Sequence, residues 1–146
     1  METDLLAQLI AKKHDVLDQL RHLARRQAQL ITEGEMVKLL AILASKQMLL
    51  SELQRIERAL DPFREQDPDS RRWRSAEDRL RTRQLVERCQ GLLDEIMLLE
   101  KQGETELLQR RDAAAQRLQG MHTASEARSA YLQSADGPRR LDLSSE

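Results

Sequence analysis

Residues 5–31 read LLAQLIAKKHDVLDQLRHLARRQAQLI, and the spacing within this stretch decides the fold. Large apolar side chains recur every seven positions, at Leu9, Val16, Leu23 and Leu30. Further apolar residues stand between them at helical steps, as they do along one face of an amphipathic helix. The stretch therefore predicts a long helix over residues 3–31 whose apolar face must be covered by another element.

The composition of the whole chain agrees with this helix. Ala, Glu, Lys, Leu and Arg make up slightly over half of the 146 residues, which is typical of long helices and coiled coils. The aromatic residues are Phe63, Trp73 and Tyr131, and Val, Ile and Thr are sparse, although sheets favour all of these types. We expect an all-α protein: an antiparallel bundle or hairpin of long coiled-coil-like helices with a flexible C-terminal tail.

Two local signals place the second helix at residues 36–60. Thr32 and Glu35 have the spacing of a capping box, in which each side chain bonds the other residue's backbone amide, so we expect the helix to restart there. Asp61 precedes Pro62, and the residue before a proline is pushed away from helical dihedrals. The second helix should therefore end at residue 60.

A proline-containing loop over residues 61–72 separates this helix from a third one, expected over residues 72–119. Gly103 interrupts the apolar pattern of the third helix and is a candidate weak point or bend. Residues 121–146 are rich in small and polar side chains, which indicates a flexible tail. Residues 125–133 could form a short helix within it. The expected organisation is a helical bundle domain over 1–120 followed by that tail.

Charge and cysteine content limit the class of protein. Lys and Arg number 24 against 25 for Asp and Glu, so no global basic field would attract nucleic acid. The single cysteine, Cys89, has no CxxC companion, which fits a reducing compartment. The sequence has neither a secretory signal at its start nor an apolar run of the ~20 residues that a membrane helix needs. We expect a cytoplasmic protein that binds protein, with no nucleic acid and no membrane insertion.

Few residues suggest catalysis or metal binding. His14 and His22 each stand four positions from Asp18, a spacing at which a helix could hold a metal ion, but their charged neighbours favour solvated side chains. Ser and Cys nucleophiles lack an identifiable base, and no Gly-rich loop resembles a phosphate cradle. The expectation is a protein that is not an enzyme and uses no cofactor or metal.

Arginines concentrate between residues 71 and 88, and acidic residues interleave with them. We favour a solvated, ion-paired face for this segment. A salt-sensitive acidic partner is the alternative. Phe63 and Trp73, on either side of the loop, are expected to cap the end of the bundle.

The apolar residues occur in adjacent pairs, such as Leu39/Leu40 and Leu107/Leu108, which make faces too wide for a two-helix seam. Each helix should therefore touch more than one neighbour: the chain's own helices, a second copy in a homodimer, or a bound partner helix. A groove for a partner helix could use apolar residues of the third helix. The candidates are Met97, Leu98, Leu107, Leu108, Leu118 and Met121.

The segment from Leu30 to Leu53 resembles FlgN-type flagellar export chaperones. In that family a Leu/Glu-containing helix end is followed by a small-plus-acidic pair, a leucine repeat, a lysine and a Leu-Leu pair. Gly34-Glu35 and Lys46 stand in the matching places. The overall plan, long helices and a tail of small residues that carries a tyrosine, is similar as well.

The resemblance implies a cytoplasmic chaperone of the flagellar type III export system. Such proteins hold hook–filament junction proteins by their C-terminal amphipathic helices and pass them to the export gate without hydrolysing ATP. The family's gate-docking tyrosine maps to Tyr131, with Leu132 beside it. The alternative is a structural coiled-coil or homo-oligomeric adaptor protein without a secretion client.

Overall fold

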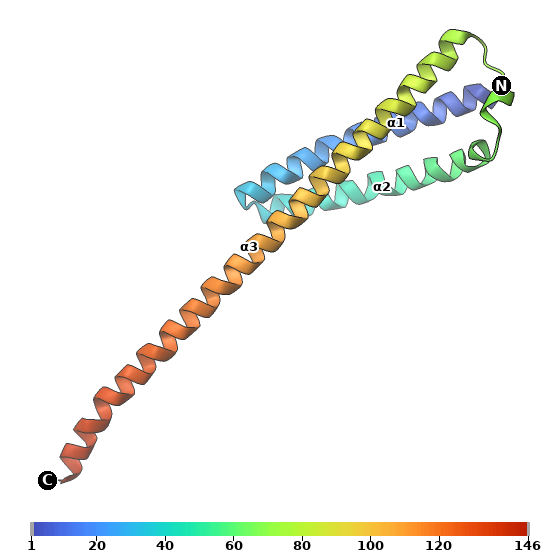
Figure 1. Cartoon of the computed structure of the whole chain (residues 1–146). Coiled ribbons are helices and arrows are strands. Elements are labelled where there is room, and N and C mark those ends of the chain that lie inside the picture. The colour runs from blue at the N-terminus through green and yellow to red at the C-terminus, as the bar shows by residue number, and fades with distance from the viewer. Residues whose placement is uncertain (1, 146) are drawn as a thin grey trace. The chain divides into compact units, whose positions relative to one another are not determined.

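The computed structural model describes the backbone of residues 2–145 and the side chains of residues 2–133 (Figure 1). It contains three long helices, α1 (Glu2–Glu33), α2 (Met36–Arg64) and α3 (Ala76–Ser145), and a short 3-10 helix, η1 (Pro68–Ser70). Residues 2–145 contain no strand. The all-α helical bundle predicted from the sequence is confirmed.

The chain divides into two units, Met1–Glu106 and Leu107–Glu146. The first unit holds α1, α2, η1 and the first part of α3, and the second holds the remainder of α3. Each is described by itself below.

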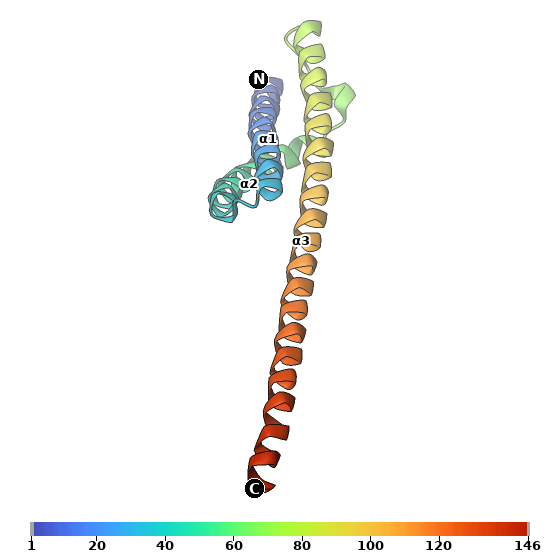
Figure 2. The same ribbon diagram turned by 90° about the vertical axis from the view of Figure 1, so that its left-hand side faces the viewer.

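Polar contacts define how the helices of the first unit run. Lys13 Nζ lies 2.8 Å from Glu57 Oε1, and Gln66 Nε2 donates to Glu2 Oε1 at 3.0 Å, so α1 and α2 are antiparallel. Arg25 Nε donates to Glu95 Oε1 at 3.0 Å, seventy residues further along the chain. Asp4, Arg25 and Thr32 bond to Arg74, Glu95 and Glu106, which lie 70, 70 and 74 residues further along the chain. This nearly constant separation in sequence shows that α1 and the start of α3 run parallel (Figure 2).

The core of the first unit receives side chains from all three helices. Leu17, Leu30 and Ile31 of α1 are fully buried, in agreement with the heptad pattern of residues 5–31. Burying a side chain of this kind stabilises a fold by about 1.5–3 kcal/mol. The members of the main cluster are Leu6, Leu9, Ile10, Val16, Leu17, Leu20, Ile56, Leu60, Phe63, Cys89, Leu92 and Ile96.

The break between α1 and α2 is made by Gly34 and not by a capping box. Gly34 has φ 75°, its N–H donates to Ile31 O at 3.1 Å, and the Glu35 N–H donates to Leu30 O at 3.0 Å. This is the Schellman arrangement of a helix C-terminus, which favours glycine because a Cβ is disfavoured at positive φ. Thr32 belongs to the last turn of α1, where its hydroxyl donates to Ala28 O, and Glu35 makes no side-chain cap. The predicted capping box is therefore wrong.

The helix α2 continues through Pro62 to Arg64, beyond the expected end at residue 60. Phe63 is buried, and the Arg64 side chain bonds back to Glu57 O and to the Asp61 carboxylate. These contacts hold a last turn that the proline alone would disfavour. The segment between α2 and α3 is accordingly 65–75 instead of the predicted 61–72, and it includes η1.

The helix α3 starts at Ala76 and not at Arg72, because Ser75 Oγ accepts a hydrogen bond from the Asp78 N–H and caps the helix there. The helix is unbroken at Gly103, so no helix end or break occurs at that position. It also continues past residue 119, the expected end, and includes residues 125–133. The mobility expected for residues 121–146 stays a prediction.

Candidate partner-binding surfaces

The structure assigns the apolar pairs to core or surface. Val16 and Leu17 are both buried, whereas the pair Leu39/Leu40 is split, with Leu39 7% and Leu40 66% exposed. Leu5 is likewise exposed beside the buried Leu6. The bundle therefore covers one member of several pairs and leaves the other on the surface.

Sequence reasoning missed an exposed apolar face on the first half of α2. We call this the α2 face, and it consists of Met36, Val37, Leu40, Leu43 and Met48. Val37 is 82% exposed, so these residues are not core. Contiguous exposed apolar surface of this kind marks interaction sites more often than ordinary surface does. The pairs Leu39/Leu40 and Ile42/Leu43 were the available signal, but a sequence does not say which member of a pair faces outward.

Two predicted client-binding residues, Met97 and Leu98, lie on the surface of the first unit. They follow the buried Ile96 on α3. Two residues after Leu98, the Glu100 carboxylate pairs with Lys46 and links α3 to α2. Lys46, which the family resemblance singled out, therefore contributes an ion pair within the bundle.

The other predicted residues lie in the second unit. Leu108, Leu118, Met121, Tyr131 and Leu132 are exposed, as is every side chain from 108 to 133, and Leu107 is half-buried. Part of this set follows helical spacing along one side of the helix. We call this side the α3 stripe, and it consists of the predicted residues Leu107, Leu118 and Met121 together with Ala114. Because the predicted client-binding residues fall in two units, their forming one site stays a prediction.

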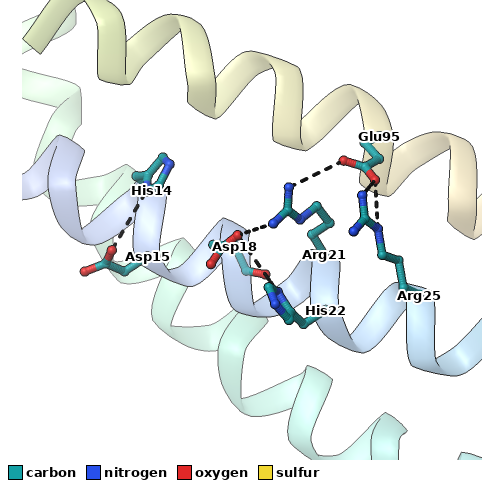
Figure 3. Close-up of polar contacts among 7 residues, drawn as sticks. All are labelled: His14, Asp15, Asp18, Arg21, His22, Arg25 and Glu95. Atoms are coloured by element: carbon teal, nitrogen blue, oxygen red, sulfur yellow. Dashed lines mark hydrogen bonds and ion pairs between the residues drawn. The ribbon is translucent and has the colours of Figure 1, made fainter.

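The histidines considered for metal binding have separate partners (Figure 3). His22 Nδ1 lies 2.8 Å from the backbone oxygen of Asp18, and the Asp18 carboxylate accepts from Arg21 at 2.7 Å. His14 lies 3.8 Å from Asp15, away from this group (Figure 3). Within the described residues, no three His, Cys, Asp or Glu side chains are placed to hold a metal ion together.

Burial also sets the chemistry of Cys89. The side chain packs in the main core cluster, as a small hydrophobic residue would. Burial raises the pKa of its thiol, and the nearby Lys13 opposes this only in part. The thiol is therefore held in its neutral, weakly nucleophilic form. Phe63 is buried and Trp73 packs partly buried against the same cluster, so both cap the bundle as predicted.

Across the described part of the chain, no helix combines the length and apolar character required to cross a bilayer. Comparisons of the sequence with protein-family models, with curated proteins and with solved structures returned no match.

Proposed function

We propose that this protein is a cytoplasmic export chaperone of the FlgN type, which binds an amphipathic helix of a client protein along the α3 stripe. The single observation that carries the proposal is the exposure of that stripe: Leu118 and Met121 are 67% and 68% exposed on a helix whose side chains from 108 to 133 all face solvent. Apolar residues at heptad-like spacing gain free energy when another helix covers them.

The clients in this proposal are hook–filament junction proteins, bound by their C-terminal amphipathic helices. The similarity of residues 30–53 to FlgN-type chaperones supports this identity. Methionine in the stripe suits such a role, because its flexible side chain adapts to different apolar partners. No catalysis is required of the chaperone, since apolar contact alone holds the client.

Charges beside the stripe favour a client helix over a second copy of the chain. Between residues 107 and 133 the arginines outnumber the acidic residues, which are Asp112 and Glu126. Two copies paired along this stripe would bring like net charge together, whereas a helix with acidic flanks would complement it.

A pair of charge substitutions tests the proposal. Leu118→Asp places a carboxylate in the stripe and should abolish an about one-to-one complex with the C-terminal segment of a junction protein, since burying an unpaired charge is costly. Gln116→Asp adds the same charge to the opposite side of the helix and should leave binding unchanged. Calorimetry measures binding, and circular dichroism checks that helicity is kept. Leu98→Asp and Leu107→Asp test whether those residues contribute.

Absence of binding to every junction-protein segment would reject the chaperone proposal. Equal binding by Leu118→Asp and Gln116→Asp would remove the α3 stripe as the binding surface.

Docking to the export gate is the second part of the proposal and rests on Tyr131 and Leu132. Both are exposed, with Tyr131 75% accessible. Tyr131→Ala should weaken docking to the gate and leave client binding intact, because Tyr131 lies outside the α3 stripe. Unchanged docking would exclude Tyr131.

The heptad-like spacing of the stripe also supports a second candidate function, a homo-oligomeric adaptor. Sedimentation equilibrium separates the two functions. A tight dimer that binds no hydrophobic dye supports the adaptor, and a monomer that binds the dye supports the chaperone.

A further inference from the structure

The first unit contains two adjoining hollows, each of about 240 Å³. The first lies between α1, the end of α2 and α3, and reaches Cys89; the second extends toward Pro68 and Trp73. Leu6, Ile10, Arg71 and Val86 line both. We call the pair of hollows the cationic groove.

The charged residues that line the cationic groove are all basic. They are Lys13, Arg64, Arg71, Arg79 and Arg83. Lys13 and Arg64 are held by the Glu57 carboxylate. Among the residues that the structure describes, Arg71, Arg79 and Arg83 have no carboxylate partner, so the groove combines an apolar floor with uncompensated positive charge.

Arg71 itself indicates what is missing. One terminal nitrogen donates to Phe63 O, but its Nε is buried and has no acceptor. A buried donor without an acceptor is costly, above all on a charged group, so the Arg71 guanidinium is incompletely compensated within the protein. The site therefore favours an anionic ligand.

The size of the hollows favours side chains over a compact small molecule. An engineered apolar cavity of about 150 Å³ takes up benzene, so each hollow has room for one Leu- or Phe-sized group. Small-molecule sites usually measure about 300–1,000 Å³ in one pocket. Two small hollows joined at Arg71 and Val86 fit two apolar side chains of one peptide, with its carboxylates against the arginines.

We propose that the cationic groove is a docking site for an acidic peptide segment of another protein, one that carries bulky apolar side chains beside Asp or Glu. A second copy of this chain is a poor occupant, since its exposed α2 face contains no carboxylate, and arginines are in excess beside its α3 stripe. The site lies wholly in the first unit and is independent of the α3 stripe.

The single tryptophan provides the readout, because Trp73 lines the second hollow and no other indole contributes to the emission. The full-length protein is titrated with a Trp-free helical peptide of Leu and Glu, and with the same peptide in which every Glu is Gln. We expect the Glu peptide to change Trp73 emission saturably and to bind more weakly as salt is added. The Gln peptide should bind much more weakly.

Two matched pairs of variants locate the site. Val86→Glu puts a carboxylate in the groove and should weaken binding of the Glu peptide at least about tenfold, because like charges would face each other. Leu80→Glu makes the same change at an exposed residue of α3 outside both hollows and should bind like the wild type. Arg79→Gln with Arg83→Gln should weaken binding about two- to tenfold. Arg88→Gln, on the same helix but outside the groove, should not.

Equal binding of the Glu and Gln peptides, or equal effects within either pair of variants, would overturn the proposal. Trp73 emission that responds to dodecanoate but to neither peptide would also overturn it and indicate a lipid anion. Loss of binding in Leu118→Asp as well as Val86→Glu would contradict the independence of the two sites, whereas loss in Val86→Glu alone supports it.

Discussion

At the scale of single residues, Glu57 connects α1 to the end of α2. Its carboxylate lies 2.8 Å from Lys13 Nζ and also accepts from Arg64. Burial alone would raise the pKa of Glu57, but the hydrogen bonds and charges of Lys13 and Arg64 outweigh it and hold the pKa below its usual value. The same contact, with its hydrogen bond to Glu57 as the main cause, raises the pKa of Arg64.

The lowered pKa of Glu57 predicts a pH dependence of stability. Because the unfolded chain takes up this proton at higher pH than the folded protein does, the contribution is present above the ordinary value of 4.5 and is lost as the pH falls through the folded-state pKa. Urea unfolding at about pH 6 and about pH 3 should show a smaller acid-induced loss of stability in Glu57→Gln than in the wild type. An equal loss in both proteins would contradict this assignment.

Gly103 is a second residue whose role depends on its neighbours. It is buried, and a Cβ built on it would lie 3.3 Å from Ile31 Cδ1 of α1. The glycine in the apolar pattern of α3 thus marks the place where α3 closely approaches α1. Because Gly103 has no side chain, Ile31 of α1 can pack directly against α3 there.

This close approach predicts opposite effects of one substitution at two glycines. Gly103→Leu should destabilise the protein by about 1–3 kcal/mol through overpacking against Ile31. Gly91→Leu, where a Cβ meets nothing within 4 Å, should be neutral or stabilising by up to about 1 kcal/mol because leucine is the better helix former. Denaturant titration compares the two, and equal effects would mean that α1 and α3 do not approach closely at Gly103.

At the scale of elements, α2 has one buried and one exposed apolar side. Leu39 and Leu40 are neighbours in sequence and identical in type, yet only Leu39 contacts the core. The exposed side carries Val37 and Leu40 at helical spacing. The helix α2 therefore contributes to the core with one side and leaves an apolar surface open to solvent on the other.

The two leucines predict a simple comparison. Leu39→Ala should cost about 2–5 kcal/mol of unfolding free energy, as expected for truncation of a buried side chain. Leu40→Ala should change stability by no more than about 0.5 kcal/mol, because its side chain is already in solvent. Thermal or denaturant unfolding of both variants provides the measurement. A large cost for Leu40→Ala would mean that the α2 face is covered in solution.

At the scale of the whole molecule, the two units differ in what stabilises them. The first has a core drawn from three helices, and the second, over residues 108–133, has only exposed side chains. A helix without a packed face depends on its own backbone hydrogen bonds and opens easily.

Hydrogen exchange should therefore separate the units. Amides of residues 108–133 should exchange faster than those around Leu17 and Leu30, and a bound client helix should slow the exchange along the α3 stripe. Equally slow exchange in both regions without a client would indicate that something already covers the second unit.

The all-α class, the presence of three long helices and the start of α2 at residue 36 followed from the sequence alone, whereas the end of α2 and both ends of α3 did not. The features that followed depend on periodicity and on residues such as Gly34, which act on the chain locally. The predicted capping box is wrong because the Schellman arrangement at Gly34 already provides an acceptor for the Glu35 N–H. The helix α2 continues beyond Pro62 because Phe63 is buried by residues that are distant in the sequence.

Only the tertiary structure decided which apolar residues are surface. Leu39 and Leu40, or Ile96 and Met97, are equivalent in sequence, and the helix that covers one of each pair comes from another part of the chain. The cationic groove could not be predicted from the sequence either. Its lining combines Leu6 and Ile10 of α1 with Arg71 and Val86, which are more than sixty residues away in the chain. Periodicity is a property of neighbours along the chain, whereas burial and charge compensation depend on residues that meet only after folding.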